Sequence, residues 1–193
     1  MKNESLPDLL SYRELAAHDL TRHGLAQLIE SDQFEKVAPG LFLRTGTADD
    51  TTAAWIAIAQ KRPEATLCLL TALSIHDLSD EIPRQSDIAI PRGMQTVSVS
   101  GAPISWHRFD PDTFDIGREH FPLPAGRTIG IYSSARTVVD VFRLRHTWGN
   151  DLAHGALKRW LAIPGNSPSA LLNLAEHFPK ARPALHHALE VLL

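Results

Sequence analysis

Histidine and carboxylate side chains are the residues of this 193-residue chain most able to do acid-base or metal chemistry. Ten histidines are present, but no pair has metal-ligand spacing with a second supporting pair, and adjacent His186 and His187 point to different faces of a helix. Asp112 and Glu119 resemble a nuclease carboxylate pattern, yet Phe121 stands where its lysine belongs. Glycine-rich phosphate loops, Gly-x-Ser-x-Gly and Cys-x-x-Cys motifs are absent. We therefore predict a protein without enzymatic activity, metal or cofactor.

A second set of residues fits recognition of double-stranded DNA. One short helix is expected to expose, on its early face, Arg22, His23, Ala26 and Gln27. Of these, Arg22 can bond guanine and Gln27 can read adenine, and the positive end of the helix dipole suits the major groove. Lys36 and Arg44, a little further along, can take phosphates. These six residues are the predicted DNA-binding site.

The elements that must position this site are read from caps and apolar spacing. Ser11 is an N-cap candidate with Glu14 three residues on, a capping box for a helix over 12–19. Thr21 is the N-cap of a second helix over 22–32. Residues 34–44 then form two apolar runs around Pro39-Gly40, a hairpin signal. A hairpin directly after a helix-turn-helix predicts a winged helix-turn-helix domain over residues 1–46.

The remaining residues, 47–193, predict a second domain that mixes helices with a small sheet. Helices are expected over 53–60 and 66–78, and β-prone runs over 87–91, 96–100, 104–109 and 128–132. Four more helices, ending the chain in a helical bundle, are expected over 134–146, 150–161, 167–177 and 180–193. The fold class is therefore predicted to be α+β.

A third charged group lies in the first of those C-terminal helices. Arg136, Asp140 and Arg143 are spaced to share one helix face. One interpretation is that Asp140 simply pairs with both arginines. The other is that spare positive charge meets an external partner, with a contact surface predicted at Arg136, Arg143, Lys158 and Arg159.

Net charge and hydropathy limit the possible environments. The formal charge is −3 overall, and the balance is −2 over 1–46, −5 over 47–119 and +4 over 120–193. Binding by bulk electrostatics is thus disfavoured, and specific contacts must carry any DNA affinity. The single cysteine, Cys68, lies in an uncharged stretch too short to span a membrane, and the N-terminal residues do not resemble a secretory signal. A cytoplasmic location is expected, with no membrane partner.

Three segments together resemble the AbiEi family, the antitoxins of AbiE-type toxin-antitoxin systems. They are residues 11–42, ending in Gly-Leu-Phe; residues 71–78, Thr-Ala-Leu-Ser-Ile-His-Asp-Leu; and residues 133–140, Ser-Ser-Ala-Arg-Thr-Val-Val-Asp. The chain departs from the family pattern at Asp77, where glycine is frequent, and in its short or absent first helix. The resemblance implies a repressor that binds its own promoter and whose second domain counters a nucleotidyltransferase-like toxin. The alternative function is a protein-protein adaptor whose winged helix does not bind DNA.

Overall fold

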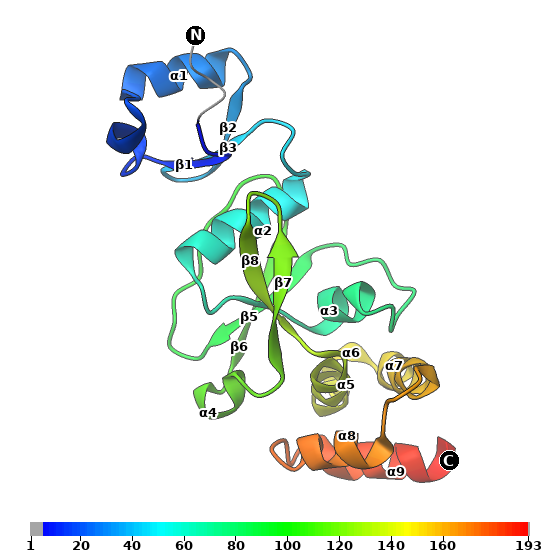
Figure 1. The fold of residues 1–193 in the computed structure, drawn as a ribbon. Coiled ribbons are helices and arrows are strands. Elements are labelled where there is room, and N and C mark those ends of the chain that lie inside the picture. Colours follow the sequence, from blue (N-terminus) through cyan, green and yellow to red (C-terminus); the bar gives the residue numbers. More distant parts are fainter. Residues whose placement is uncertain (1–5, 193) are drawn as a thin grey trace. The chain divides into compact units, whose positions relative to one another are not determined.

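The computed structural model describes residues 6–192, which adopt an α+β fold with two β-sheets (Figure 1). The described chain divides into two compact units. The first takes the residues up to Ala65 together with Gln95–Pro103 and Phe121–Ile129, and the second takes the intervening segments and everything from Gly130 onward. None of the helices in residues 6–192 is long and apolar enough to cross a membrane.

The first unit opens with a small antiparallel sheet and a short helix. Its elements are β1 (Leu9–Ser11), the 3-10 helix η1 (Leu15–His18), α1 (Arg22–Glu30), β2 (Phe34–Ala38), β3 (Leu41–Arg44) and α2 (Asp50–Lys61). The sheet order is β1-β3-β2. Leu25 and Leu28 of α1 pack with Phe34 and Phe42 of the hairpin in one buried cluster. The sheet and the helix thus form a shared core that fixes which face of α1 points to solvent.

The hairpin between β2 and β3 turns at Pro39-Gly40. Gly40 has a φ of +73°, a backbone conformation that glycine adopts without strain. Proline before a left-handed glycine is typical of a type II turn. The turn residues therefore explain why the two strands pair, with Ala38 opposite Leu41.

The second unit is built on the other sheet, whose strand order is β6-β5-β4-β8-β7. Its strands are β4 (Thr66–Leu67), β5 (Ser86–Pro91), β6 (Ile104–Phe109), β7 (Arg118–Leu123) and β8 (Arg127–Tyr132). The short strand β4 pairs antiparallel with β5 and parallel with β8, while β5 and β6 are parallel. The far ends of β7 and β8, within Phe121–Ile129, belong to the first unit.

Helices complete the second unit. They are α3 (Leu69–Ile75), α4 (Pro111–Phe114), α5 (Ser134–Arg143), α6 (Arg145–Trp148), α7 (Asn150–Ala162), α8 (Pro168–Ala175) and α9 (Arg182–Leu192). Helix α5 contacts α3, α7, α8 and α9, and its residues 136–142 are all buried. Because it is surrounded in this way, α5 has almost no surface to offer a partner.

Most of the elements agree with the sequence-based predictions, and the differences have physical causes. The hairpin over 34–44 and the Thr21 cap are confirmed. Residues 12–19 form only η1, and 96–100 are not a strand. The predicted helix over 66–78 is β4 followed by α3, because the backbone at Cys68 is extended. The helix over 134–146 ends at Arg143, where Leu144 leaves helical geometry.

Three strands had not been predicted, and the compact units divide the chain elsewhere than between residues 46 and 47. Strands β1 and β4 are very short, and β7 is an edge strand that carries charges and Pro122, a residue tolerated only at such edges. The first unit continues past Gly46 because α2, with its buried alanine and isoleucine side chains, packs against β2. Residue 193, part of the last predicted helix, lies outside the described residues.

Candidate nucleic-acid interface and a buried arginine network

Helix α1 presents an exposed polar face whose position follows from its cap and its core contacts. The Thr21 hydroxyl accepts a hydrogen bond from the Gly24 amide at 3.0 Å, which fixes the start of the helix. Leu25 and Leu28 are buried. The four side chains predicted to read DNA are all exposed: Arg22, His23, Ala26 and Gln27. Sequence spacing and structure therefore agree on which face of α1 is available to a ligand.

The exposed side chains of α1 are ordered by weak local contacts. His23 Nε2 and Gln27 Nε2 lie 3.2 Å apart, one helical turn from each other. The Arg22 guanidinium carbon lies 5.1 Å from the centre of the Tyr12 ring, within the range of a cation-π contact. Neither contact involves an acidic group. No carboxylate among residues 6–192 pairs with Arg22, so its charge is not neutralised there while its position is restrained.

The two predicted phosphate contacts behave differently. Lys36, on β2, is exposed. Arg44 Nε donates to Asp8 Oδ1 at 2.8 Å, and Arg44 Nη2 donates to the Leu6 carbonyl at 2.7 Å. The same guanidinium stacks on Phe34 at 5.0 Å. Because Asp8 balances its charge and its Nε and Nη2 each donate within the protein, Arg44 holds the sheet to the N-terminal residues, and its assignment as a phosphate contact stays a prediction that this ion pair disfavours.

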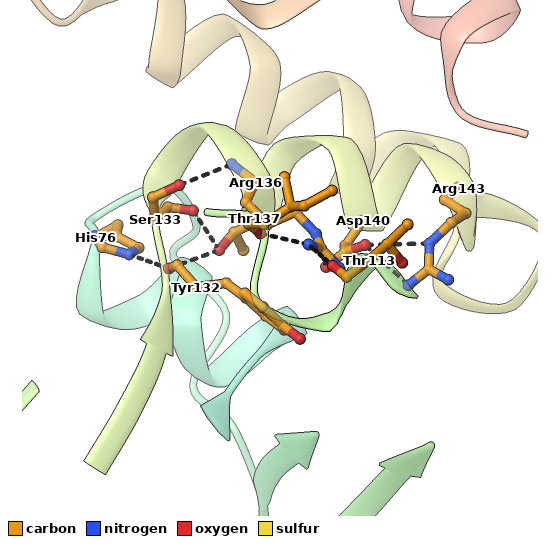
Figure 2. A network of polar contacts seen from close by, with 9 residues as sticks. His76, Thr113, Tyr132, Ser133, Arg136, Thr137, Asp140 and Arg143 are labelled. Atoms are coloured by element: carbon orange, nitrogen blue, oxygen red, sulfur yellow. Dashed lines mark hydrogen bonds and ion pairs between the residues drawn. The ribbon is translucent and has the colours of Figure 1, made fainter. Parts of the chain in front are cut away.

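Arg136 is completely buried, which corrects its assignment to a partner-binding surface. Its Nε donates to Asp140 Oδ2 at 3.0 Å, and its Nη1 donates to the carbonyl oxygens of Thr113 and Ile116 at 2.9 and 2.5 Å (Figure 2). The guanidinium also lies between two aromatic rings, 4.3 Å from that of Tyr132 and 4.1 Å from that of Phe178. Arg136 therefore joins α5 to the α4 segment and to the C-terminal helices.

Asp140 and Arg143 complete the same network. Arg143 Nε donates to Asp140 Oδ1 at 3.1 Å, and its guanidinium lies 4.5 Å from the Phe109 ring centre. Burial raises the pKa of Asp140, while the positive charges of Arg136 and Arg143 act in the opposite direction. The interpretation in which Asp140 simply pairs with both arginines is thus the one that the geometry supports. Arg143, four-fifths buried, is likewise corrected as a partner contact.

The other two residues of the predicted partner surface lie on α7 and are exposed. Lys158 has no hydrogen bond or ion pair with another described residue, and Arg159 pairs with Asp80. The sequence analysis predicts all four cations to share one surface. Side-chain spacing shows that Arg136 and Arg143 share a face of α5, but it does not show whether that face points to the core or to solvent. Only α7 carries exposed members of the set.

The remaining acid-base residues have structural contacts. His107 Nε2 lies 2.9 Å from Asp87 Oδ1 and 3.4 Å from Ser105 Oγ, so one nitrogen serves both neighbours. A Ser-His-Asp relay requires opposite ring nitrogens, so this trio lacks that geometry. Within residues 6–192, no group of three His, Cys, Asp or Glu side chains is placed to hold a metal ion. Burial raises the pKa of Cys68 well above its usual value, which keeps the thiol protonated.

Sequence reasoning missed one basic feature of the first unit. A hollow of about 650 Å³ is lined in part by Arg13 and by Lys61 and Arg62, a neighbouring pair 48 positions further along the sequence. Lys61 and Arg62 stand at the C-terminal end of α2, an apolar helix. No local sequence pattern relates this helix end to Arg13. Their proximity is visible only in three dimensions.

Comparison with known proteins gives a match to a solved structure. No protein-family model matches the chain, and no curated protein sequence does either. The structure is similar to the crystal structure of the RV2827C protein from Mycobacterium tuberculosis, with a TM-score of 0.64 and 13% sequence identity over 97% of this chain and 73% of that one. At this identity the likeness establishes a shared fold and nothing about activity.

Proposed function

We propose that this protein is a DNA-binding transcriptional regulator that acts as an antitoxin, with α1 as the reading helix of a winged helix-turn-helix. The observation that carries the proposal is the exposed face of α1, where Arg22 and Gln27 stand clear of the core while Leu25 and Leu28 anchor the opposite side. Side chains on the first turns of such a helix reach base edges in the major groove. The β2–β3 hairpin that follows takes the place of the wing.

The proposed contacts divide into two kinds. Arg22, His23, Ala26 and Gln27 face the bases, and arginine to guanine and glutamine to adenine are the expected pairings. Lys36, exposed on β2, contacts a phosphate and positions the domain without reading sequence. Arg44 has no role in this scheme because Asp8 already balances it.

The antitoxin part of the proposal rests on the resemblance of three motifs to the AbiEi family. On this reading the protein represses its own promoter in the cytoplasm, has no enzymatic activity, and opposes a nucleotidyltransferase-like toxin through its second unit. The Ser133–Asp140 motif supplies the buried network of α5, so the toxin contact must come from another element. The exposed cations Lys158 and Arg159 on α7 are the candidates that remain.

One observation favours the alternative, a protein-protein adaptor. The first 46 residues have a charge balance of −2, and Arg44, one of their few cations, is paired with Asp8. Affinity for phosphates depends on unneutralised cations, so the pairing of Arg44 with Asp8 makes DNA binding by these residues less favourable. Discriminating the two functions requires a direct binding measurement.

A gel shift with the DNA upstream of the protein's own gene tests the proposal. Retarded migration of this DNA at protein concentrations that leave an unrelated duplex of equal length unshifted is the expected result. Equal retardation of both duplexes, or of neither, would contradict sequence-specific regulation. Co-expression with a nucleotidyltransferase-like toxin from a neighbouring reading frame tests the antitoxin role separately, with restored growth expected.

A further inference from the structure

The hollow in the first unit has a distinctive composition. Its cationic members are Arg13, Lys61 and Arg62, and the rest of its lining is Ser11, Tyr12, Pro39, Gly40, Leu41, Gln60 and Val97. None of these lining residues is acidic. Three positive charges thus converge on a concave surface in a chain whose net charge is negative.

Two of the three cations, Lys61 and Arg62, are oriented by backbone carbonyls without being neutralised. Lys61 Nζ donates to the Pro39 carbonyl at 2.8 Å. Arg62 Nε donates to the Gln95 carbonyl at 3.0 Å, and its Nη1 donates to the Lys61 carbonyl at 2.8 Å. Carbonyl oxygens fix the direction of a side chain but carry no full charge, and each cation keeps N–H donors for another acceptor.

Several other cations of the described chain are paired with carboxylates. Carboxylates within 4.0 Å balance a further set: Arg44, Arg92, Arg136, Arg143, Arg159 and Arg182. Among the described residues, no ion pair involves Arg13, Lys61 or Arg62. Unbalanced positive charge in a concave surface attracts anions and raises their local concentration.

The hollow is continuous with the exposed face of α1. Tyr12, 48% exposed, belongs to its wall and stacks with Arg22, the first residue of α1. The other wall contains Pro39 and Gly40, the turn of the hairpin. One ligand long enough to pass the start of α1 and the hairpin turn can therefore contact the α1 face and the hollow together.

We propose that this hollow binds the phosphodiester backbone of the same duplex whose bases α1 reads, with Arg13, Lys61 and Arg62 contacting phosphates. This inference rests on the proposed function and deepens it, because Lys61 and Arg62 add two cations that the −2 balance of residues 1–46 does not count. Lys61 is the last residue of α2 and Arg62 is its C-cap, so the DNA-binding surface includes residues beyond the hairpin.

The test is a titration of the full-length protein with fluorescent upstream DNA and an unrelated duplex at several salt concentrations. The variant Arg13→Gln, Lys61→Gln, Arg62→Gln is compared with Arg84→Gln, Arg108→Gln, Lys180→Gln, which removes three exposed charges from the second unit. Each lost phosphate contact lowers the salt slope by about 0.9, so the hollow variant is expected to lose roughly two to three units of slope. Its preference between the two duplexes is expected to remain, and the control variant is expected to match wild type.

The outcomes separate the two proposals. Wild-type protein that binds neither duplex contradicts the proposed function itself. Specific binding by wild type with an unchanged slope in the hollow variant contradicts only the phosphate contacts of the hollow. Should the triple variant melt early, Arg13→Gln alone decides, because Arg13 makes no hydrogen bond with another described residue: a slope lower by about one unit supports the inference, and an unchanged slope overturns it.

Discussion

Arg136 and Asp140 form an ion pair whose two side chains are both fully shielded from solvent, with Nε and Oδ2 3.0 Å apart. Charges taken out of water are tolerated only when they find partners, and here the aromatic rings of Tyr132 and Phe178 and two backbone carbonyls surround the Arg136 guanidinium, whose Nη2 alone has no hydrogen-bond partner among the described residues. The pair therefore specifies how α5 docks with its neighbours. A stable second unit depends on it.

Removing either partner of this pair is expected to be severely destabilising. Arg136→Gln leaves the buried Asp140 carboxylate with Arg143 as its remaining ionic partner, and removal of one member of a buried pair costs up to about 3–5 kcal/mol. Urea denaturation followed by circular dichroism measures the loss in free energy of unfolding. Lys158→Gln on the exposed side of α7 is the matched control and is expected to change stability by less than about 0.5 kcal/mol. A fully stable Arg136→Gln protein would show that the network is dispensable.

Gly117 is expected to tolerate no side chain. Its φ is +69°, and a Cβ built there would lie 2.8 Å from the Cβ of Arg136. Gly117→Ala is therefore strained in its backbone and also displaces the arginine network, so we expect a loss of more than about 1 kcal/mol in the free energy of unfolding. Gly165→Ala, with a positive φ but open space around it, isolates the backbone part of the penalty. Equal losses in the two variants would argue against the contact with Arg136.

Sequence patterns predicted the local elements around α1 and failed at the interior of the second unit, for a physical reason. Thr21 caps a helix, and Pro39 and Gly40 form a turn, through contacts with residues two or three positions away. Such local effects can be predicted from the sequence. The burial of Arg136 depends on Phe178, 42 residues later, and on carbonyls from the α4 segment. Helical periodicity located its face correctly without revealing that other helices cover it.

The candidate site shows the same division. The exposure of Arg22 and Gln27 follows from leucine spacing on their own helix. Arg44 pairs with Asp8, and Arg13 lines the same hollow as Lys61. The two residues of each pair are more than thirty positions apart in the sequence. No local pattern encodes such contacts, since they depend on how the sheet and α2 pack.

Asp49, the N-cap of α2, makes stability depend on pH at the acid end. Its carboxylate accepts the Thr52 amide at 2.8 Å, and this hydrogen bond lowers the pKa of Asp49 below its ordinary value. The ionised cap therefore contributes stability above the pKa of the unfolded chain, and this contribution is lost as pH falls through the folded value. Asp49→Asn keeps a cap without the charge and is expected to cost about 0.3–1 kcal/mol at pH 7 and close to nothing below about pH 3.

Thermal melting of wild type and Asp49→Asn across this pH range checks the sign of the effect. The melting temperatures are expected to converge as pH falls, because wild type loses its charge while the variant has none to lose. Asp49→Ala, which removes the cap itself, is expected to stay below Asp49→Asn at every pH by about 0.5–2 kcal/mol in stability. A difference between wild type and Asp49→Asn that grows toward low pH would refute this account of the cap.

Lys36 and Arg44 are expected to separate phosphate binding from stability. Lys36→Ala removes an exposed charge, so it should lower affinity for all DNA alike and reduce the salt slope by about one unit with unchanged melting. Arg44→Ala breaks the contacts with Asp8 and Phe34, so it should lower the melting temperature. Paired melting and salt titrations measure both effects. An Arg44→Ala protein with native stability and a reduced slope would restore Arg44 as a phosphate contact.

The central claim, that α1 reads DNA sequence, is tested most directly by fluorescence anisotropy of the Arg22→Ala, Gln27→Ala double variant against upstream DNA and an unrelated duplex. Both side chains are exposed, so melting should be close to that of wild type. Each substitution is expected to cost about 1–3 kcal/mol at the specific site, with little change on the unrelated duplex, so that the preference between them collapses. A folded double variant that retains the full wild-type preference would contradict the claim.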